Sequence, residues 1–185
     1  MASTSTTSSS SSSSSLTMSS ASNTDKTHSW DLRKKYVKGF LQTLGAFKNL
    51  PETHQQKGFV SDMMRNLLKI DLIEPGRIIC HLTVKRLVTN AYGTFHGGTV
   101  AGVAELVAMA CARTVVSEDR DLFLGEMSMS YLSASAINVD LEIDGRIVRS
   151  GRNVTTVSVE FRVKGTEKLV YTARATFFAE PVSKL

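Results

Sequence analysis

The chain is short of cysteine, has no long uninterrupted apolar run and carries only a small excess of basic residues. Its two cysteines, Cys80 and Cys111, lie in apolar surroundings and lack the close Cys or His spacing of a zinc site, so we expect reduced core residues. The apolar stretch at 97–116 contains Glu105 and Arg113, which argues against a membrane span. A net charge of +5 without an aromatic-interleaved basic patch gives no reason to expect nucleic-acid binding, although it suits a small polyanionic ligand.

Two helical patterns precede the main domain. Apolar residues recur at helical spacing between residues 30 and 50, and Pro51 ends that pattern. Lysines share the polar side of this segment, for which packing on the protein's own domain is favoured over contact with a membrane. The second helical set consists of Phe59, Val60, Met63, Met64 and Leu67. We assign residues 28–65 to an N-terminal helical extension.

After residue 67 the apolar residues alternate with polar ones, which indicates β-strands. The one-sided apolar sets lie at residues 78–84, 127–131, 139–143, 157–163 and 169–177. Gly151 and Gly165 lie between the later sets, where hairpin turns belong, and Glu74-Pro75-Gly76 is another candidate turn. The pattern predicts a half-buried, largely antiparallel sheet of five or six strands within residues 66–182.

One long helix, from about Gly98 to Ser117, interrupts these strands. Because this segment is apolar on nearly every side, other parts of the protein must bury it. The predicted fold is therefore an α+β architecture in which one antiparallel sheet wraps around one central helix.

A His-Gly-Gly turn opens this helix, in the stretch NAYGTFHGGTVAGVAELVAMACA that begins at Asn90. Gly97 and Gly98 would present unpaired backbone N–H groups at the helix start, where a partial positive charge attracts a developing oxyanion. Glycine lets a substrate carbonyl approach the backbone closely. One such donor contributes roughly 3–4 kcal/mol to an acyl-transfer transition state. An ordinary helix-start turn is the alternative.

Glu105 is the only acidic residue of this apolar stretch, and removing an unpaired carboxylate from water costs several kcal/mol. It lies eight residues after Gly97, a rise of about 12 Å along a helix, so it is too far from a carbonyl held by the Gly97 amide of its own chain. A second, antiparallel helix could bring its Glu105 opposite this Gly97, which predicts a two-fold dimer with two composite sites. A structural carboxylate paired with Arg113 or a backbone group is the alternative.

Two further residues of the turn are candidates for the site. Asn90 can donate or accept a hydrogen bond and could hold the carbonyl or orient water, while capping of its own loop fits the sequence equally well. His96 is better suited to fixing the loop by hydrogen bonds than to titrating in the reaction. The sequence contains no Gly-x-Ser-x-Gly elbow and no suggestive His–Cys pair, so no catalytic triad is predicted.

The segment NAYGTFHGGTVAGVAELVAMA, followed by MSMSYLSAS and RSGRNVTTVSVEF, resembles the hotdog-fold acyl-CoA thioesterases, in particular the phenylacetyl-CoA thioesterase-like branch. The resemblance covers about residues 66–180. It implies that the Gly97 N–H polarises the thioester carbonyl, that Asn90 helps to position it, and that Glu105 of the facing subunit activates water or attacks the carbonyl. Many relatives carry Asp at the acidic position, and family members form dimers that often pair into tetramers.

The turn Arg149-Ser150-Gly151-Arg152-Asn153 resembles the family segment that contacts coenzyme A. Arginine forks suit the phosphates of that ligand. We therefore expect Gly98, Arg149, Gly151 and Arg152 to bind CoA, with a solvated hairpin turn as the alternative. No metal and no separate cofactor is expected, because CoA is part of the substrate.

Both ends of the chain bear on its destination in the cell. Residues 1–27 form a Ser/Thr-rich tract with almost nothing to bury, which predicts a disordered tail, and the same composition is found in organellar transit peptides. The chain ends in Ser183-Lys184-Leu185, a tripeptide that the peroxisomal import receptor recognises. The more specific signal predicts a peroxisomal protein, with the plastid as the alternative.

Together these patterns predict a thioesterase that hydrolyses an acyl-CoA, fatty or aromatic, to a free acid and CoA. Two other functions compete with this one. The first is hydration of an enoyl-CoA on the same fold, which usually requires an Asp and a His that work together. The second is binding of acyl-CoA without catalysis.

Overall fold

The computed structural model describes residues 59–181, together with residues 28, 32, 34–39, 42 and 52. The chain forms two compact units, Met1–Asn49 and Leu50–Leu185. In the first unit residues 34–39 are helical, in agreement with the helix predicted there. The predicted disordered tail at 1–27 and the terminal tripeptide at 183–185 lie outside the described residues.

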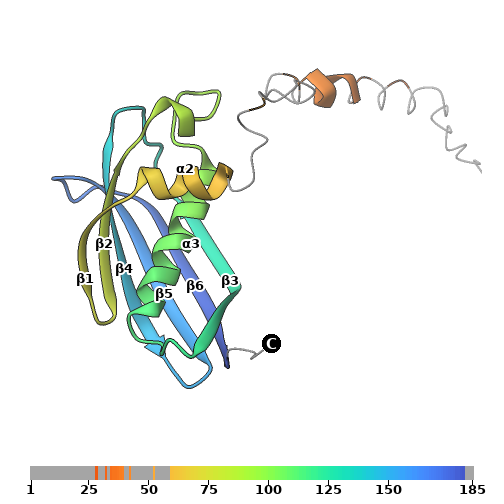
Figure 1. The fold of residues 1–185 in the computed structure, drawn as a ribbon. Coiled ribbons are helices and arrows are strands. Elements are labelled where there is room, and N and C mark those ends of the chain that lie inside the picture. The colour runs from red at the N-terminus through yellow and green to blue at the C-terminus, as the bar shows by residue number, and fades with distance from the viewer. Residues whose placement is uncertain are drawn as a thin grey trace, which may run out of the picture. The chain divides into compact units, whose positions relative to one another are not determined.

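Six strands of the second unit form one antiparallel sheet (Figure 1). In chain order they are β1 (Lys69–Glu74), β2 (Arg77–Thr83), β3 (Arg120–Tyr131), β4 (Asp140–Ser150), β5 (Val154–Val163) and β6 (Leu169–Pro181). Their spatial order is β1-β2-β4-β5-β6-β3, and each neighbouring pair is antiparallel. The two edges of this sheet are therefore β1 and β3.

The helices of this unit are α2 (Phe59–Leu67) and α3 (Gly97–Arg113), and a short 3-10 turn, η2 (Arg86–Val88), follows β2. Figure 1 shows α3 lying along one face of the sheet, with α2 crossing over it. A Cβ added at Gly102 of α3 would lie 2.5 Å from Met64 Cε of α2, so glycine allows this close approach of the two helices. Among the helices that the structure describes, none is long and apolar enough to cross a membrane.

The core lies between α3 and the sheet. The residues of β2 alternate between buried and half-buried, as the sequence pattern predicted, with Ile78, Cys80 and Leu82 inward. The opposing face of α3 buries Thr99, Val100, Val103, Ala104, Val107, Ala108, Cys111 and Ala112. Phe161 of β5 and Phe177 of β6 are fully buried between them. The predicted α+β arrangement, one antiparallel sheet around one long helix, is confirmed.

The central helix ends four residues before the predicted Ser117, because α3 stops at Arg113 and Thr114 is its C-cap. The Thr114 hydroxyl donates to the Cys111 carbonyl oxygen at 2.7 Å and accepts the Gly76 N–H at 2.8 Å. Gly76 has a φ of +82° in the turn between β1 and β2, a conformation that favours glycine. Thr114 therefore fastens the end of the helix to this turn.

Candidate active site

The residue before α3 caps its N-terminus. His96 is the N-cap with an extended backbone, and its Nδ1 accepts the Gly98 N–H at 3.0 Å. Because Nδ1 is the acceptor, the ring N–H lies on Nε2. The Gly97 N–H has no hydrogen-bond partner among the described residues, so it is a free donor of this helix start. His96 thus fixes the turn, and Gly97 keeps its amide available.

Tyr131, the last residue of β3, lies against Gly97. Its hydroxyl donates to the Gly97 carbonyl oxygen at 3.0 Å, and a Cβ built on Gly97 would lie 3.5 Å from the Tyr131 ring. Tyr131 also packs edge to face on Tyr171, with ring centroids 5.9 Å apart, and the buried Tyr171 hydroxyl accepts the Ser135 N–H at 3.0 Å. Tyr131 is 52% exposed, so one side of its ring contacts the buried Tyr171 and the other faces solvent beside the helix start.

Asn90 organises the loop that leads into α3. Its Oδ1 accepts the backbone N–H groups of Tyr92 at 3.0 Å and of Thr94 at 3.2 Å. Its Nδ2 donates to Thr94 Oγ1 at 2.9 Å, and Gly93 turns the loop with a φ of +71°. Loop capping, one of the two predicted roles of Asn90, is therefore present in the structure. Nδ2 keeps a second hydrogen that it could donate to a ligand.

Glu105 lies on the side of α3 that the sheet does not cover. It is half-buried, between the buried Ala104 and the exposed Leu106. Within residues 59–181 its carboxylate forms no ion pair. Arg113, the partner considered from the sequence, instead donates from Nη1 to the Arg120 carbonyl oxygen at 2.6 Å. The ion pair with Arg113 that would give Glu105 a purely structural role is therefore absent from the described residues.

The arginine-rich turn connects β4 to β5. The Gly151 N–H donates to the Val154 carbonyl oxygen at 2.8 Å, and Arg149 and Arg152 are exposed on either side of it. Asn153 Oδ1 accepts from Arg120 Nη2 at 3.0 Å, which ties the turn to the start of β3. Gly151 thus lies in the predicted hairpin turn, and both guanidinium groups are accessible to a ligand.

The direction of the strands separates this turn from the glycine turn of the same chain. Asp140, at the start of β4, pairs with Thr83, at the end of β2. The chain then passes from β2 to α3, and the His96 N–H donates to the Val88 carbonyl oxygen at 2.8 Å. The start of α3 therefore lies at the end of the sheet where β4 begins, and the arginine-rich turn lies at the end where β4 stops. A single chain does not bring these two features together.

Both cysteines lie in the core and are free. Burial raises the pKa of Cys80 to about 11, with a further contribution from the negative charge of Asp71. Burial likewise raises the pKa of Cys111 to about 11, with Asp144 adding to the effect. The two thiols therefore stay protonated at neutral pH and are unsuited to nucleophilic attack. The prediction of core cysteines is confirmed.

Sequence comparison identifies the family. Residues 92–170 match the model described as Thioesterase superfamily. The chain is 30% identical over 114 residues to acyl-coenzyme A thioesterase 13 of Homo sapiens, covering 60% of this chain and 81% of that protein. The chain belongs to the thioesterase superfamily. The protein of the same name from Mus musculus is 28% identical over 131 residues, covering 70% of this chain and 93% of that protein. The predicted family and enzyme class, an acyl-CoA thioesterase, are confirmed.

Solved structures agree on the fold. Zebra fish thioesterase superfamily member 2 superposes with a TM-score of 0.61 at 23% identity, covering 69% of this chain and 90% of that one. A Streptococcus mutans protein bound to acetyl CoA superposes with a TM-score of 0.57 at 24% identity, covering 62% and 89%. At these identities the likeness concerns the fold, and the predicted hotdog fold is confirmed.

Tyr131 is the residue of this region that the sequence pattern did not single out. The alternation of residues 127–131 placed it in a strand, on the same side as Met127 and Met129. Nothing in the local sequence indicates contact with Gly97, which lies 34 residues earlier in the chain. Its position between a glycine turn and the core makes it a candidate for holding that turn in place.

Proposed function

We propose that this member of the thioesterase superfamily hydrolyses acyl-CoA in two composite sites of a two-fold dimer. In each site the Gly97 amide of one subunit holds the thioester carbonyl, and Glu105 of the partner subunit drives the attack. The observation that carries this proposal is the free Gly97 N–H at the start of α3, held by His96 on one side and by Tyr131 on the other. A fixed donor of this kind stabilises a developing oxyanion.

Two features support the dimer. First, Glu105 lies two helical turns after Gly97, about 12 Å along the axis of the same helix, so only another chain can place a carboxylate opposite the amide. Second, β3 is an edge strand of 12 residues whose outer side has no neighbouring strand among the residues that the structure describes. Pairing of β3 with its copy around a two-fold axis would complete the sheet and orient the two α3 helices antiparallel.

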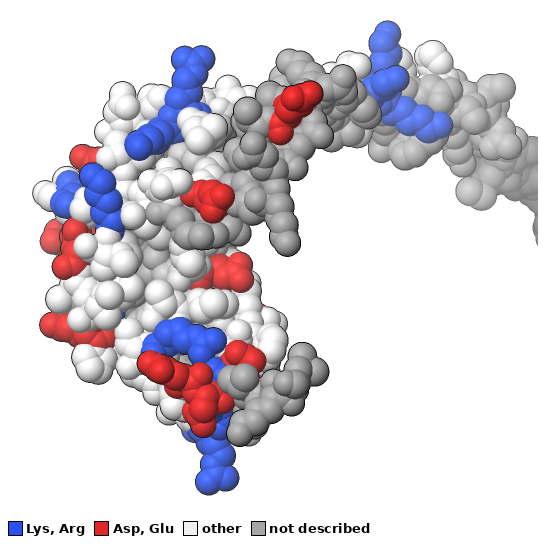
Figure 2. Space-filling model, viewed as in Figure 1, with Lys and Arg blue, Asp and Glu red and all other residues white. Residues whose placement is uncertain are grey.

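The distribution of charged residues is consistent with a partner subunit that covers the face on which α3 lies. Figure 2 shows that, where residues are coloured, Lys, Arg, Asp and Glu are sparse over the middle of the face on which α3 lies and gather toward its margins. Interfaces between copies of one protein are depleted of charge at their centre. Glu105, half-buried on α3, would then lose contact with bulk water when the dimer forms.

The chemistry follows from these positions. In the base mechanism, the Glu105 carboxylate removes a proton from water while the water oxygen bonds to the thioester carbon. The carbonyl π electrons move onto oxygen, which the Gly97 N–H stabilises. When the tetrahedral intermediate collapses, the C–S bond breaks and the CoA thiolate takes the proton from Glu105. Direct attack by the carboxylate, through an anhydride, is the competing path, and incorporation of labelled oxygen into Glu105 in a single turnover would identify it.

The remaining residues position the substrate. Arg149 and Arg152 would bind the phosphates of CoA, and Gly151 allows the turn between them to lie close to the ligand. Because this turn lies at the far end of the sheet from Gly97 of its own chain, it would serve the site whose Gly97 belongs to the partner. Asn90 would donate its second Nδ2 hydrogen to the substrate or to water. The Gly98 amide, already bound to His96, would contribute through its lack of a side chain.

The direct test follows thiol release from acyl-CoA by wild-type protein and two Glu→Gln variants. We expect Glu105→Gln to lower kcat by a factor of about a thousand or more while acyl-CoA still binds. Glu160→Gln is the matched control and should keep wild-type kcat, since within residues 59–181 the Glu160 carboxylate forms an ion pair with Arg162 alone, on the outer face of the sheet. Undiminished turnover by Glu105→Gln would rule out the mechanism, and absence of thiol release by wild-type protein would rule out the activity.

We also propose that the chain is imported into peroxisomes through Ser183-Lys184-Leu185. The support for this lies in the sequence of the C-terminus alone. A fluorescent protein fused to the N-terminus, which leaves the C-terminus free, should colocalise with a peroxisomal marker and become diffuse when residues 183–185 are removed. Unchanged location after the deletion, or location in plastids, would refute import through this tripeptide.

A further inference from the structure

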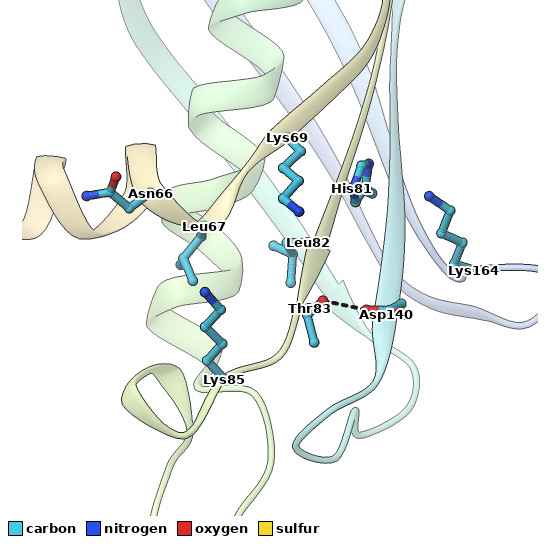
Figure 3. Close-up of a pocket in the computed structure, with 9 residues that line it drawn as sticks. All are labelled: Asn66, Leu67, Lys69, His81, Leu82, Thr83, Lys85, Asp140 and Lys164. Carbon is cyan, nitrogen blue, oxygen red and sulfur yellow. Dashed lines mark hydrogen bonds between the residues drawn. The ribbon is translucent and has the colours of Figure 1, made fainter.

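We infer that a cleft at the β1 edge of the sheet binds a small phosphate-bearing anion. The cleft has a volume of about 320 Å³ and is lined by the end of α2, parts of β1 and β2, and the segments that follow β2 and β5. Three lysines surround it, Lys69, Lys85 and Lys164. They come from the start of β1, from the segment after β2 and from the turn after β5, so distant parts of the sequence line one cleft with three lysines. Figure 3 draws Lys69 and Lys85 to one side of β2 and Lys164 to the other side.

The positive charge of this cleft is poorly neutralised. In the described part of the chain, neither Lys69 nor Lys85 has a carboxylate within ion-pair distance. Lys164 has one remote contact, because its Nζ lies 3.9 Å from Asp71 Oδ2. That carboxylate also lies 2.7 Å from Nδ1 of His81, whose side chain lines the cleft.

The lining itself contributes one carboxylate, Asp140, and the Thr83 hydroxyl donates a hydrogen bond to it. Three lysines thus line a cleft that is open to solvent, and two carboxylates oppose them, Asp140 in the lining and Asp71 beside His81 and Lys164. Like charges gathered in this way raise the electrostatic free energy, and an anion that enters the cleft lowers it. Phosphate is the expected ligand, because it carries several oxygens and each lysine can bind a different one through its ammonium group.

The cleft and the start of α3 lie at the same end of the sheet. Lys85 precedes η2, and Val88 at the end of η2 accepts the N–H of the α3 N-cap, His96. CoA carries a 3′-phosphate as well as a pyrophosphate, so an acyl-CoA held at Gly97 could direct one of these groups toward the lysines while the other reaches the arginine-rich turn of the partner subunit. A free nucleotide or pyrophosphate could bind the same groups as a separate ligand. Acyl-CoA and the free anions all present phosphate oxygens to the lysines. Only binding of acyl-CoA in the cleft rests on the proposed function.

The binding experiment uses the full chain and calorimetric titration with inorganic pyrophosphate and with ADP. We expect the double variant Lys69→Ala/Lys85→Ala to weaken binding of these probes about five- to thirtyfold. The control is Lys168→Ala/Arg174→Ala, which removes the same total charge from exposed positions outside the cleft. This control should bind within about twofold of wild type. Because all four side chains are exposed, thermal melts should confirm that both variants fold.

A kinetic arm separates the two sources of phosphate. Acyl-CoA is compared with the same acyl group on N-acetylcysteamine, a thiol without phosphate. If the cleft holds the nucleotide of the substrate, the lysine variant raises KM for acyl-CoA and leaves the N-acetylcysteamine thioester unaffected. If it holds a separate anion, KM for acyl-CoA stays unchanged while binding of pyrophosphate or ADP is lost.

Either of these outcomes supports the phosphate site. Binding of pyrophosphate, ADP and CoA that is equal in the lysine variant and in the control, or undetectable in wild-type protein, would overturn it. Failure of the proposed function looks different, because wild-type protein would then release thiol from neither thioester while its affinity for pyrophosphate could still be measured.

Discussion

Replacing Tyr131 with phenylalanine tests whether the glycine turn must be held in place for catalysis. The variant keeps the ring that lies against Gly97 and packs on Tyr171, and removes only the hydroxyl that donates to the Gly97 carbonyl oxygen at 3.0 Å. A hydrogen bond of this kind contributes about 0.5–1.5 kcal/mol to stability, and the exposure of half the side chain favours the lower end. We therefore expect the free energy of unfolding to fall by less than about 1 kcal/mol.

The effect on turnover should exceed the effect on stability. The Gly97 donor is expected to contribute roughly 3–4 kcal/mol to the transition state, and it depends on the orientation of its peptide. Loss of the Tyr131 hydrogen bond should forfeit part of that contribution. We expect kcat to fall about three- to tenfold, which corresponds to about 0.7–1.4 kcal/mol, with KM within about twofold of wild type.

Tyr171→Phe is the matched control, because it removes a hydroxyl from a neighbouring ring without touching Gly97. The buried Ser135 N–H would lose its acceptor, at a cost of about 1–3 kcal/mol in stability. This variant should unfold at lower urea concentration and keep a kcat close to wild type. Steady-state thiol release and urea unfolding measure both quantities. Wild-type kcat in Tyr131→Phe, or an equal loss in both variants, would refute the positioning role.

Three further predictions follow from the structure. Gly97→Ala should fold normally, since its Cβ meets only ordinary contact distances, but lose at least tenfold in kcat/KM because the methyl group obstructs the carbonyl; a wild-type value would contradict this. Burial alone would raise the pKa of Asp144, but hydrogen bonds from Arg77 and Arg146 outweigh it and hold the pKa below its ordinary value. The stability that the ionised Asp144 carboxylate contributes is therefore complete above about pH 4 and is lost as pH falls through its folded-state pKa. Asp144→Asn should accordingly lower the free energy of unfolding by about 1 kcal/mol at pH 7 and by less in acid. Cys80 and Cys111 should resist alkylation at pH 8 and react once the protein is unfolded in urea; rapid labelling of the native protein would show that they are not buried thiols.

The fold was predictable from the sequence because its strands and its central helix bury apolar residues with clear periods. The alternation at residues 78–84 reappears as the buried and half-buried positions of β2, and Gly165 occupies a turn with a φ of +77°. The end of α3 was predicted wrongly, since apolar residues continue past it. Thr114 binds the distant Gly76 amide, a contact that a local pattern does not contain.

The site was predictable only in its local parts. The His-Gly-Gly turn identified the helix start, and the capping bond from Gly98 to His96 spans two residues. Tyr131 reaches Gly97 because β3 lies beside β6 at the far edge of the sheet, which depends on the strand order. The lysines of the β1-edge cleft are likewise far apart in sequence. The net charge of the chain therefore indicated an excess of basic residues, but not that three lysines would line one cleft.

The central claim is that each site combines Gly97 of one subunit with Glu105 of the other. Two inactive variants, Glu105→Gln and Gly97→Val, can be coexpressed with different tags and purified as the mixed dimer. One of its two sites would then unite an intact Gly97 with an intact Glu105, so we predict about half of wild-type thiol release. A mixed dimer as inactive as its parents, or a protein that hydrolyses acyl-CoA as a monomer, would contradict the account.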